Sequence, residues 1–177
     1  MGNLDNKQIL LIVGQKNYSE EELEYLRAEL EKEGAEVWVA SNSPEKALGR
    51  LDGYVTPDLT IGDANPEEYD VIILTGGAGG RVYLWDDPDT QELVRRAHSA
   101  GKLIAAISTA PVVLANAGIL EGKRATVYPD YDSAETLIAR GAKTVQQSVV
   151  VDDNIITCNH PRHLSKFKEA IVSKLQE

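Results

Sequence analysis

The sequence is poor in several features that mark specialised classes of protein. Its 177 residues include one cysteine, one methionine and one phenylalanine. A single cysteine excludes an intramolecular disulfide and points to a reducing compartment. No apolar run approaches the roughly 18 residues of a membrane span, and the first residues, MGNLDNKQ, lack the basic and apolar regions of a signal peptide. We therefore expect an intracellular, cytoplasmic protein with no membrane partner.

Basic residues are also few. The chain has 18 Lys and Arg against 28 Asp and Glu, which gives a formal net charge of −10. Nucleic acids and anionic surfaces attract clustered Lys and Arg, so we expect no nucleic-acid partner. The 42% hydrophobic and 26% charged residues are ordinary for a globular protein. Since domains average about 100–200 residues, residues 1–177 are expected to form a single domain.

Short apolar runs alternate along the chain with stretches of helical periodicity. Strands are expected at 7–13, 36–40, 71–74, 103–107, 125–128, 149–151 and 155–157. Helices are expected at 19–33, 87–100, 111–117, 133–140 and from 164 to the C-terminus. This alternation predicts an α/β fold in which helices cover both faces of a parallel sheet. The turn-rich segment 41–63 is expected at the sheet edge.

The most informative segment is residues 105–111, AAISTAP, where a buried strand runs directly into a helix. Ser108 stands at the corner, and Ala106 and Ala110 lie two positions to either side. A nucleophile elbow needs small residues at these two positions, because the sharp turn presses them against the strand. The alternative is that Ser108 caps the helix that follows, which is a common use of serine.

Two other segments admit both a functional and a purely structural interpretation. The run 75–80, TGGAGG, follows a strand but has neither the Gly-Lys-Ser/Thr of a phosphate loop nor dinucleotide-type glycine spacing. Its glycines either supply an oxyanion N–H or form a flexible turn. Ser19 and Glu22 fit a helix capping box, a role that explains Glu22 without catalysis.

The only cysteine and two of the three histidines gather in the segment 158–163, CNHPRH. Cys158, His160 and His163 provide three metal-ligating side chains in a C-x-H-x-x-H pattern. No fourth ligand is evident, and the spacing matches no standard zinc site. We therefore expect neither a metal nor a cofactor.

Taken in order, several motifs resemble those of the ThiJ/PfpI superfamily of class I glutamine amidotransferase-like proteins. They are LTGG at 74–77, AISTAP at 106–111, NAGIL at 116–120, TVYP at 126–129, and the tail VVVD at 149–152 with IIT at 155–157. The resemblance covers nearly the whole chain. It implies a flavodoxin-like or Rossmann-like fold and self-association as dimers, trimers or hexamers. Activities in the superfamily include peptidases, glyoxalase or deglycase-type enzymes, isonitrile hydratases, chaperones and inactive relatives.

The resemblance also implies roles for individual residues. The elbow of the superfamily reads Ala-Ile-Cys-His-Gly/Ala-Pro, so Ser108 replaces the nucleophilic cysteine and Thr109 replaces the histidine. Glu22 matches the glutamate that hydrogen-bonds the nucleophile. Gly77 and Thr109 match the two oxyanion positions, and Tyr128 matches a tyrosine that lines the pocket.

The tail supplies one further candidate. In the superfamily it reads Thr-Ser-Arg-x-Pro and passes beside the elbow, whereas here residues 157–161 read TCNHP. This placement would bring His160 near Ser108, as a candidate base.

Two functional hypotheses follow. In the first, the protein is a hydrolase acting on peptides, amides or small carbonyl adducts, in which Ser108 attacks and His160 or Glu22 is the base. In the second, the loss of both Cys and His leaves an inactive relative that binds a small carbonyl or carboxylate ligand, or serves in a stress response. A flavin or nucleotide carrier is disfavoured because a phosphate loop is absent. An engineered Cys→Ser change at position 108 is disfavoured because Thr109 is not the family's His.

Overall fold

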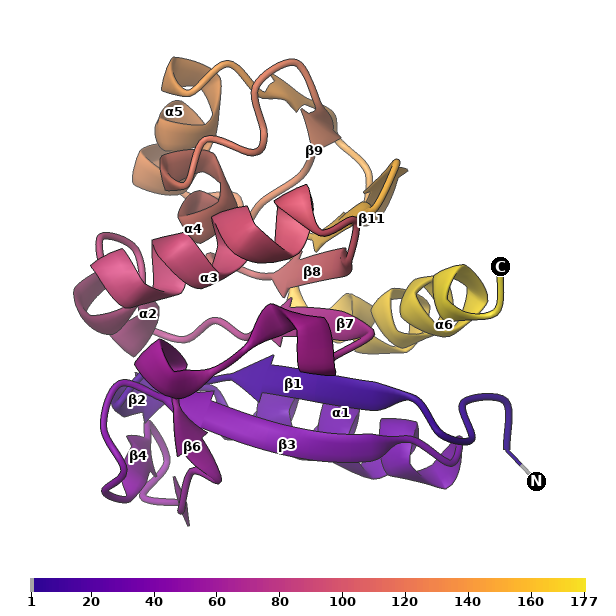
Figure 1. Cartoon of the computed structure of the whole chain (residues 1–177). Coiled ribbons are helices and arrows are strands. Elements are labelled where there is room, and N and C mark those ends of the chain that lie inside the picture. The colour runs from indigo at the N-terminus through magenta and orange to yellow at the C-terminus, as the bar shows by residue number, and fades with distance from the viewer. Residues whose placement is uncertain (1) are drawn as a thin grey trace.

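A computed structural model describes residues 2–177; Met1, where the expected domain begins, lies outside the described residues. A seven-stranded sheet in the order β11-β12-β8-β7-β1-β3-β6 forms its centre (Figure 1). Every neighbouring pair is parallel except β11 and β12. Its strands are β1 (Gln8–Ile12), β3 (Glu36–Ser41), β6 (Leu59–Thr60), β7 (Val71–Leu74), β8 (Leu103–Ile107), β11 (Val149–Asp152) and β12 (Ile155–Cys158).

Smaller elements surround this sheet. A three-stranded sheet joins β2 (Lys16–Tyr18), β4 (Ala47–Gly49) and β5 (Tyr54–Val55), and a separate pair joins β9 (Arg124–Ala125) and β10 (Lys143–Thr144). The α-helices are α1 (Glu20–Lys32), α2 (Gly79–Tyr83), α3 (Pro88–Ser99), α4 (Pro111–Asn116), α5 (Tyr131–Ala139) and α6 (Leu164–Leu175). Short 3-10 helices are η1 (Ile61–Asp63), η2 (Pro66–Glu68) and η3 (Pro161–His163).

The core has two layers because successive side chains of a strand point to opposite faces of the sheet. On one face, Ile9 and Leu11 of β1 pack in a buried cluster with α1 and α6, which includes Leu26 and Phe167. On the other face, Leu10 of β1 packs in a cluster that includes buried residues of α3, α4 and α5. Helices therefore cover both faces of a mostly parallel sheet, and the predicted α/β fold class is confirmed.

Two local predictions differ from the structure. The strand expected at 125–128 is wrong beyond Ala125: the N–H of Thr126 donates to Oγ1 of Thr157 at 3.0 Å instead of continuing a ladder. The glycine run at 75–80 is not simply a turn, since Gly79 begins α2. Both segments pass over one edge of the sheet, where side chains also hold the backbone: the Gly76 N–H donates to Oε1 of Glu22 as the Thr126 N–H does to Thr157.

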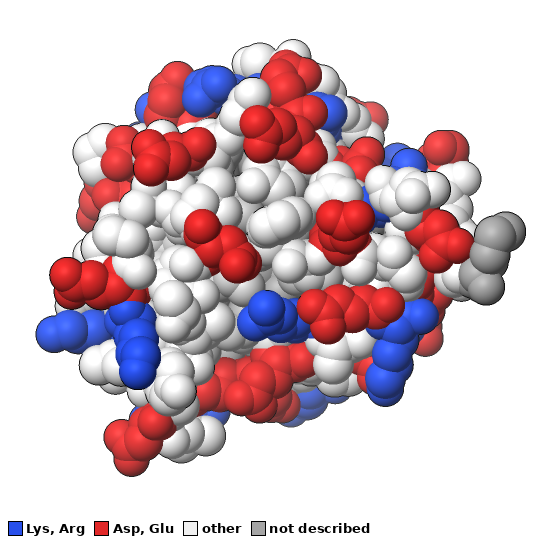
Figure 2. All heavy atoms as spheres, turned by 60° about the horizontal axis from the view of Figure 1, so that its bottom comes forward, with Lys and Arg blue, Asp and Glu red and all other residues white. Residues whose placement is uncertain are grey.

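That edge is where the carboxyl ends of β1, β7, β8 and β12 lie side by side. Ligands of open α/β sheets bind beyond such strand ends. On the face shown in Figure 2, Lys and Arg side chains lie scattered among more numerous Asp and Glu side chains. None of the helices within residues 2–177 is both long enough and apolar enough to cross a membrane.

Candidate active site

Ser108 lies at the end of β8 in a strained backbone conformation. Its φ is 62°, in the left-handed region that non-glycine residues seldom adopt, at a cost of roughly 1 kcal/mol or more. Two hydrogen bonds hold this turn: the Ser108 N–H donates to the Cys158 carbonyl at 2.9 Å, and the Tyr128 N–H donates to the Ser108 carbonyl at 2.9 Å. Helix α4 has Ala110 at its N-cap without a side-chain cap, so the helix-capping alternative for Ser108 is wrong. The corner has the geometry of an elbow.

Glu22 turns its carboxylate toward this elbow. Only half of the expected capping box forms: the Glu22 N–H donates to Oγ of Ser19 at 3.3 Å, whereas the Ser19 N–H donates to the Gly76 carbonyl. The carboxylate instead accepts two hydrogen bonds. Oε2 accepts one of 2.6 Å from the Ser108 hydroxyl, and Oε1 accepts one of 2.7 Å from the Gly76 N–H. Glu22 therefore ties the first helix to both of the loops that form the site.

Burial sets the electrostatics of Glu22. The residue is 2% exposed, and removing a carboxylate from water disfavours its charged form. This desolvation raises the pKa of Glu22 above its ordinary value, although the hydrogen bonds from Ser108 and Gly76 act in the opposite direction. A carboxylate with a raised pKa is a stronger proton acceptor, and it already lies within hydrogen-bond reach of the Ser108 hydroxyl.

The glycine corner, the segment 75–80 that leads from β7 into α2, packs directly against the elbow at Ser108. A Cβ on Gly76 would lie 2.9 Å from Cβ of Ser108, so only glycine allows this approach. Gly77 has a φ of 106°, which also favours glycine. Within residues 2–177, the N–H groups of Gly77 and Thr109 have no protein acceptor, and both residues line the same pocket as Ser108. They are the two free donors that an oxyanion needs.

The pocket over Ser108 has a volume of about 430 Å³. Glu22, Tyr128 and His160 also line it, so the site residues expected from the sequence lie around one cavity. The rings of Tyr128 and His160 stack with centroids 5.4 Å apart and planes at 20°. This stacking fixes the orientation of the His160 imidazole.

A backbone contact then fixes the tautomer of His160. Its Nδ1 accepts the N–H of Arg162 at 3.1 Å, so the neutral ring carries its proton on Nε2. An imidazole in this state can donate from Nε2 but cannot accept a proton there. The geometry therefore favours Glu22 over His160 as the base for Ser108.

Cys158 takes no part in the pocket. It is fully buried at the end of β12, and its Sγ lies 3.5 Å from the His160 carbonyl oxygen. Burial raises the pKa of its thiol to about 11. No cluster of three or more metal-ligating side chains occurs within residues 2–177, so Cys158, His160 and His163 do not converge on one point.

We expect Cys158 of the native protein to resist alkylation by a maleimide at mildly alkaline pH, because the thiolate is the reactive form and little of it is present. Unfolding in urea should restore rapid, stoichiometric labelling, measured by mass spectrometry. Rapid labelling of the folded protein would contradict the burial described above.

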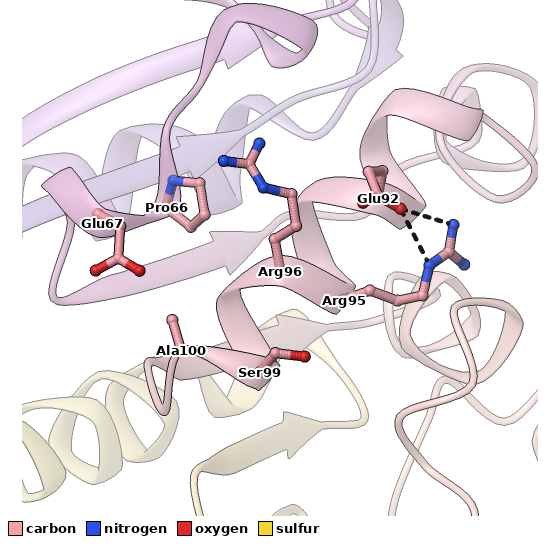
Figure 3. A pocket seen from close by; sticks show the side chains of 7 residues that line it. All are labelled: Pro66, Glu67, Glu92, Arg95, Arg96, Ser99 and Ala100. Atoms are coloured by element: carbon pink, nitrogen blue, oxygen red, sulfur yellow. Dashed lines mark hydrogen bonds and ion pairs between the residues drawn. The ribbon is translucent and has the colours of Figure 1, made fainter.

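A second concavity lies at the opposite edge of the sheet, between η2 and α3 (Figure 3). It is lined by Pro66, Glu67, Glu92, Arg95, Arg96, Ser99 and Ala100. Figure 3 shows Arg95 directed at Glu92, with which it pairs at 3.3 Å. This concavity lies near the starts of β7 and β8, and Ser99, the serine that lines it, is exposed to solvent.

The model of the DJ-1/PfpI family matches residues 7–174. The chain belongs to this family. It is 32% identical to deglycase PfpI of Pyrococcus furiosus over 168 residues, 94% of this chain and 99% of that one. It is 37% identical to an uncharacterized protein of Methanocaldococcus jannaschii, over 99% of this chain and 85% of the other. The expected superfamily is thereby confirmed.

Solved structures of the DJ-1/PfpI family agree with this assignment. A ThiJ/PfpI domain protein from Brachyspira murdochii superposes with a TM-score of 0.90 at 30% identity, covering 98% of this chain and 96% of the other. DJ-1beta of Drosophila melanogaster superposes with a TM-score of 0.87 at 31% identity, covering 99% and 91%.

Sequence reasoning missed two charged residues that line the pocket, Arg50 and Glu21. Arg50 lines the pocket from the turn between β4 and β5, in the segment expected only to lie at the sheet edge. Nothing in the local sequence marks it, because the turn reaches the pocket through pairing of β4 with β2. Glu21, beside Glu22 on α1, also lines the pocket.

Proposed function

We propose that the protein is a cofactor-independent hydrolase of the PfpI type, in which Ser108 attacks the carbonyl carbon of an amide, a peptide or a small carbonyl adduct. One observation carries this proposal: the Ser108 hydroxyl donates a hydrogen bond of 2.6 Å to the buried Glu22 carboxylate. A hydroxyl needs an adjacent base to become nucleophilic, and Glu22 is that base. The deglycase name of the Pyrococcus furiosus relative supports the reaction class.

The proton moves in a closed cycle. As Oγ of Ser108 bonds to the carbonyl carbon, its proton passes to Oε2 of Glu22, and the N–H groups of Gly77 and Thr109 bind the resulting oxyanion. When the bond to the leaving amine breaks, Glu22 returns the proton to the amine nitrogen. Water then attacks the acyl ester and gives a proton to Glu22, and Glu22 passes this proton to Oγ of Ser108 as the acid leaves.

His160 and Tyr128 have a supporting part in this reaction. His160 donates from Nε2 to an oxygen of the substrate, and its stacking on Tyr128 holds the ring in place. Self-association as a homo-oligomer stays a prediction, and so does the substrate within the class of peptides and small carbonyl compounds. The alternative is an inactive relative that keeps the pocket for a small ligand or a stress response, and it is favoured by the absence of the cysteine at position 108.

We expect a fluorophosphonate probe to label the wild-type protein at Ser108, identified by mass spectrometry, and to leave Ser108→Ala unlabelled. Peptide hydrolysis or methylglyoxal consumption should be measurable in the wild type and fall to background in Ser108→Ala. Ser99→Ala, an exposed serine of α3, is the matched control and should behave as wild type.

Ser108→Cys distinguishes the two hypotheses. If the wild type is neither labelled nor active, and Ser108→Cys alone shows turnover, the site has lost its nucleophile and the inactive alternative holds. If Ser108→Ala retains wild-type turnover, Ser108 is not the nucleophile.

A further inference from the structure

Arg50 supplies a positive charge to the pocket that the proposed reaction does not use. Among the described residues that line the pocket, it is the only lysine or arginine. No ion pair within residues 2–177 engages its guanidinium. Glu21 lines the same pocket but is exposed to solvent. The guanidinium is therefore available to a ligand above Ser108.

The turn that carries Arg50 is held by a buried carboxylate. Glu20 is 6% exposed, and its Oε2 accepts the N–H groups of Leu51 at 2.8 Å and Gly53 at 3.0 Å. Burial opposes ionisation of Glu20, but these N–H groups and the nearby charge of Arg50 prevail, so the pKa of Glu20 lies below its ordinary value. An ionised carboxylate thus pins the turn to the first residue of α1.

The turn is built to admit that carboxylate. A Cβ on Gly49 would lie 2.2 Å from Cδ of Glu20, and one on Gly53 would lie 3.0 Å from its Cγ. The Gly49 N–H closes the turn by donating to the Gly53 carbonyl at 2.8 Å, and the Arg50 N–H donates to the Tyr18 carbonyl at 3.1 Å. The backbone of Arg50 is therefore fixed on both sides.

Several of the residues that line the pocket around Ser108 offer hydrogen-bond donors. Gly77 and Thr109 offer free N–H groups, His160 offers Nε2–H, and Arg50 offers a planar fork of five donors. The oxyanion of the reaction occupies the first two donors. The remaining two suit a second oxygen-rich group, and a guanidinium fork matches a carboxylate in shape as well as charge.

We propose that Arg50 is a specificity-determining residue that selects substrates carrying a carboxylate close to the reacting carbonyl, and that Glu20 is the positioning residue that holds Arg50 over Ser108. This proposal rests on the proposed hydrolase function for its kinetic consequence. The binding of a carboxylate by Arg50 does not require turnover.

A matched pair of chromogenic esters tests the kinetic consequence. The 4-nitrophenyl monoester of succinic acid carries a free carboxylate, and 4-nitrophenyl butyrate is its neutral counterpart. We expect Arg50→Gln to lower kcat/KM for the succinate ester by about 10- to 100-fold, the range for hydrogen bonds to charged groups, and to affect the butyrate ester far less. The kcat/KM of Arg50→Lys for the succinate ester should lie between those of the wild type and Arg50→Gln, because a lysine keeps the charge but not the planar fork of donors.

Glu20→Gln tests the positioning role. It keeps the guanidinium and weakens the clamp, so KM for the succinate ester should rise while kcat changes little. Arg95→Gln, at the opposite edge of the sheet, is the control for removal of an arginine and should leave both esters unaffected. An unchanged succinate-to-butyrate ratio in Arg50→Gln would overturn the proposal.

A binding experiment separates this proposal from the proposed function. Calorimetric titration uses succinamate, which carries one carboxylate, and succinamide, in which an amide replaces it. Succinamate should bind the wild type at least about 10-fold more tightly than succinamide, and Arg50→Gln should remove the difference. That result would uphold the carboxylate site even if no ester were hydrolysed, in which case only the hydrolase function fails. Equal binding of the two compounds by the wild type would refute the carboxylate site whatever the turnover.

Discussion

Replacing Glu22 by Gln should lower kcat/KM by about 100- to 10,000-fold, the usual contribution of a general base, while the protein stays folded. Gln keeps the shape of the side chain, and its carbonyl oxygen can still accept the Gly76 N–H. Its amide cannot take a proton from Ser108. The measurement is peptide hydrolysis or methylglyoxal consumption by the variant and the wild type under identical conditions. Turnover equal to that of the wild type would exclude Glu22 as the base.

The same substitution has a distinct effect on stability. Burial raises the folded-state pKa of Glu22 above the unfolded value of about 4.3. Between these two values the folded state holds more protons than the unfolded state, so stability falls as pH rises. The loss of stability caused by ionising Glu22 is complete above the folded-state pKa and absent below the unfolded-state pKa. Glu22→Gln never ionises and escapes this loss.

Thermal unfolding should therefore show a pH-dependent difference. The Tm of Glu22→Gln relative to wild type should increase from acid toward neutral pH, and the two proteins should converge at acid pH. Glu24→Gln, an exposed position on the same helix, is the control and should follow the wild type at every pH. A pH-independent Tm difference for Glu22→Gln would show that the carboxyl is not desolvated as described.

Features encoded in contiguous residues could be predicted from the sequence. The strands β1, β7 and β8 could be predicted because β7 and β8 are wholly apolar and β1 is apolar from Ile9 to Ile12. The helix cap at Ser19 and the strand-to-helix corner at Ser108 could also be predicted, since each depends on neighbours within a few residues. The role of Glu22 had a local explanation as a capping residue, and only the resemblance to a known family pointed beyond it.

Contacts between residues far apart in the sequence could not be predicted from local patterns, and the contact of Glu22 with Ser108 was expected only from the resemblance to a known family. Glu22 meets Ser108 across 86 positions of sequence, and Glu20 meets Leu51 across 31. Such pairs arise from the order of strands in the sheet, which no local pattern specifies. The tautomer of His160 depends on the Arg162 N–H, a detail of backbone geometry rather than of residue type. Most residues of the site could therefore be predicted, whereas the choice between Glu22 and His160 as base required the structure.

A substitution at Gly79 should have the second large effect, on stability, because Gly79 lies where α2 packs on β2. Strand β2 passes beneath α2, and a Cβ on Gly79 would lie 1.6 Å from the carbonyl oxygen of Lys16. Since this neighbour is backbone, it cannot rotate away, and the strand itself must move. We expect Gly79→Ala to lower the free energy of unfolding by about 3 kcal/mol or more, at the upper end of the cost of overpacking.

Gly80→Ala is the matched control, because it places the same methyl group one residue further along the same helix. There the nearest atoms would be Oγ1 of Thr109 at 3.8 Å and Nε1 of Trp85 at 3.9 Å, which are ordinary contacts. Alanine is also favoured over glycine inside a helix by about 0.5–1 kcal/mol. Urea unfolding should therefore find Gly80→Ala as stable as wild type or slightly more so. Equal stabilities for both variants would contradict the close packing of α2 on β2.

The consequences of Gly79→Ala extend to the chemistry because β2 connects the parts of the site. The strand pairs with β4, whose turn carries Arg50, and it leads through Tyr18 into Ser19 and the start of α1. Displacing it should misplace Glu22 and Arg50 together. We therefore expect the fraction of Gly79→Ala that stays folded to lose turnover and discrimination between carboxylate-bearing and neutral esters in parallel. Loss of stability with kinetics unchanged would show instead that the glycine corner and the pocket are mechanically independent.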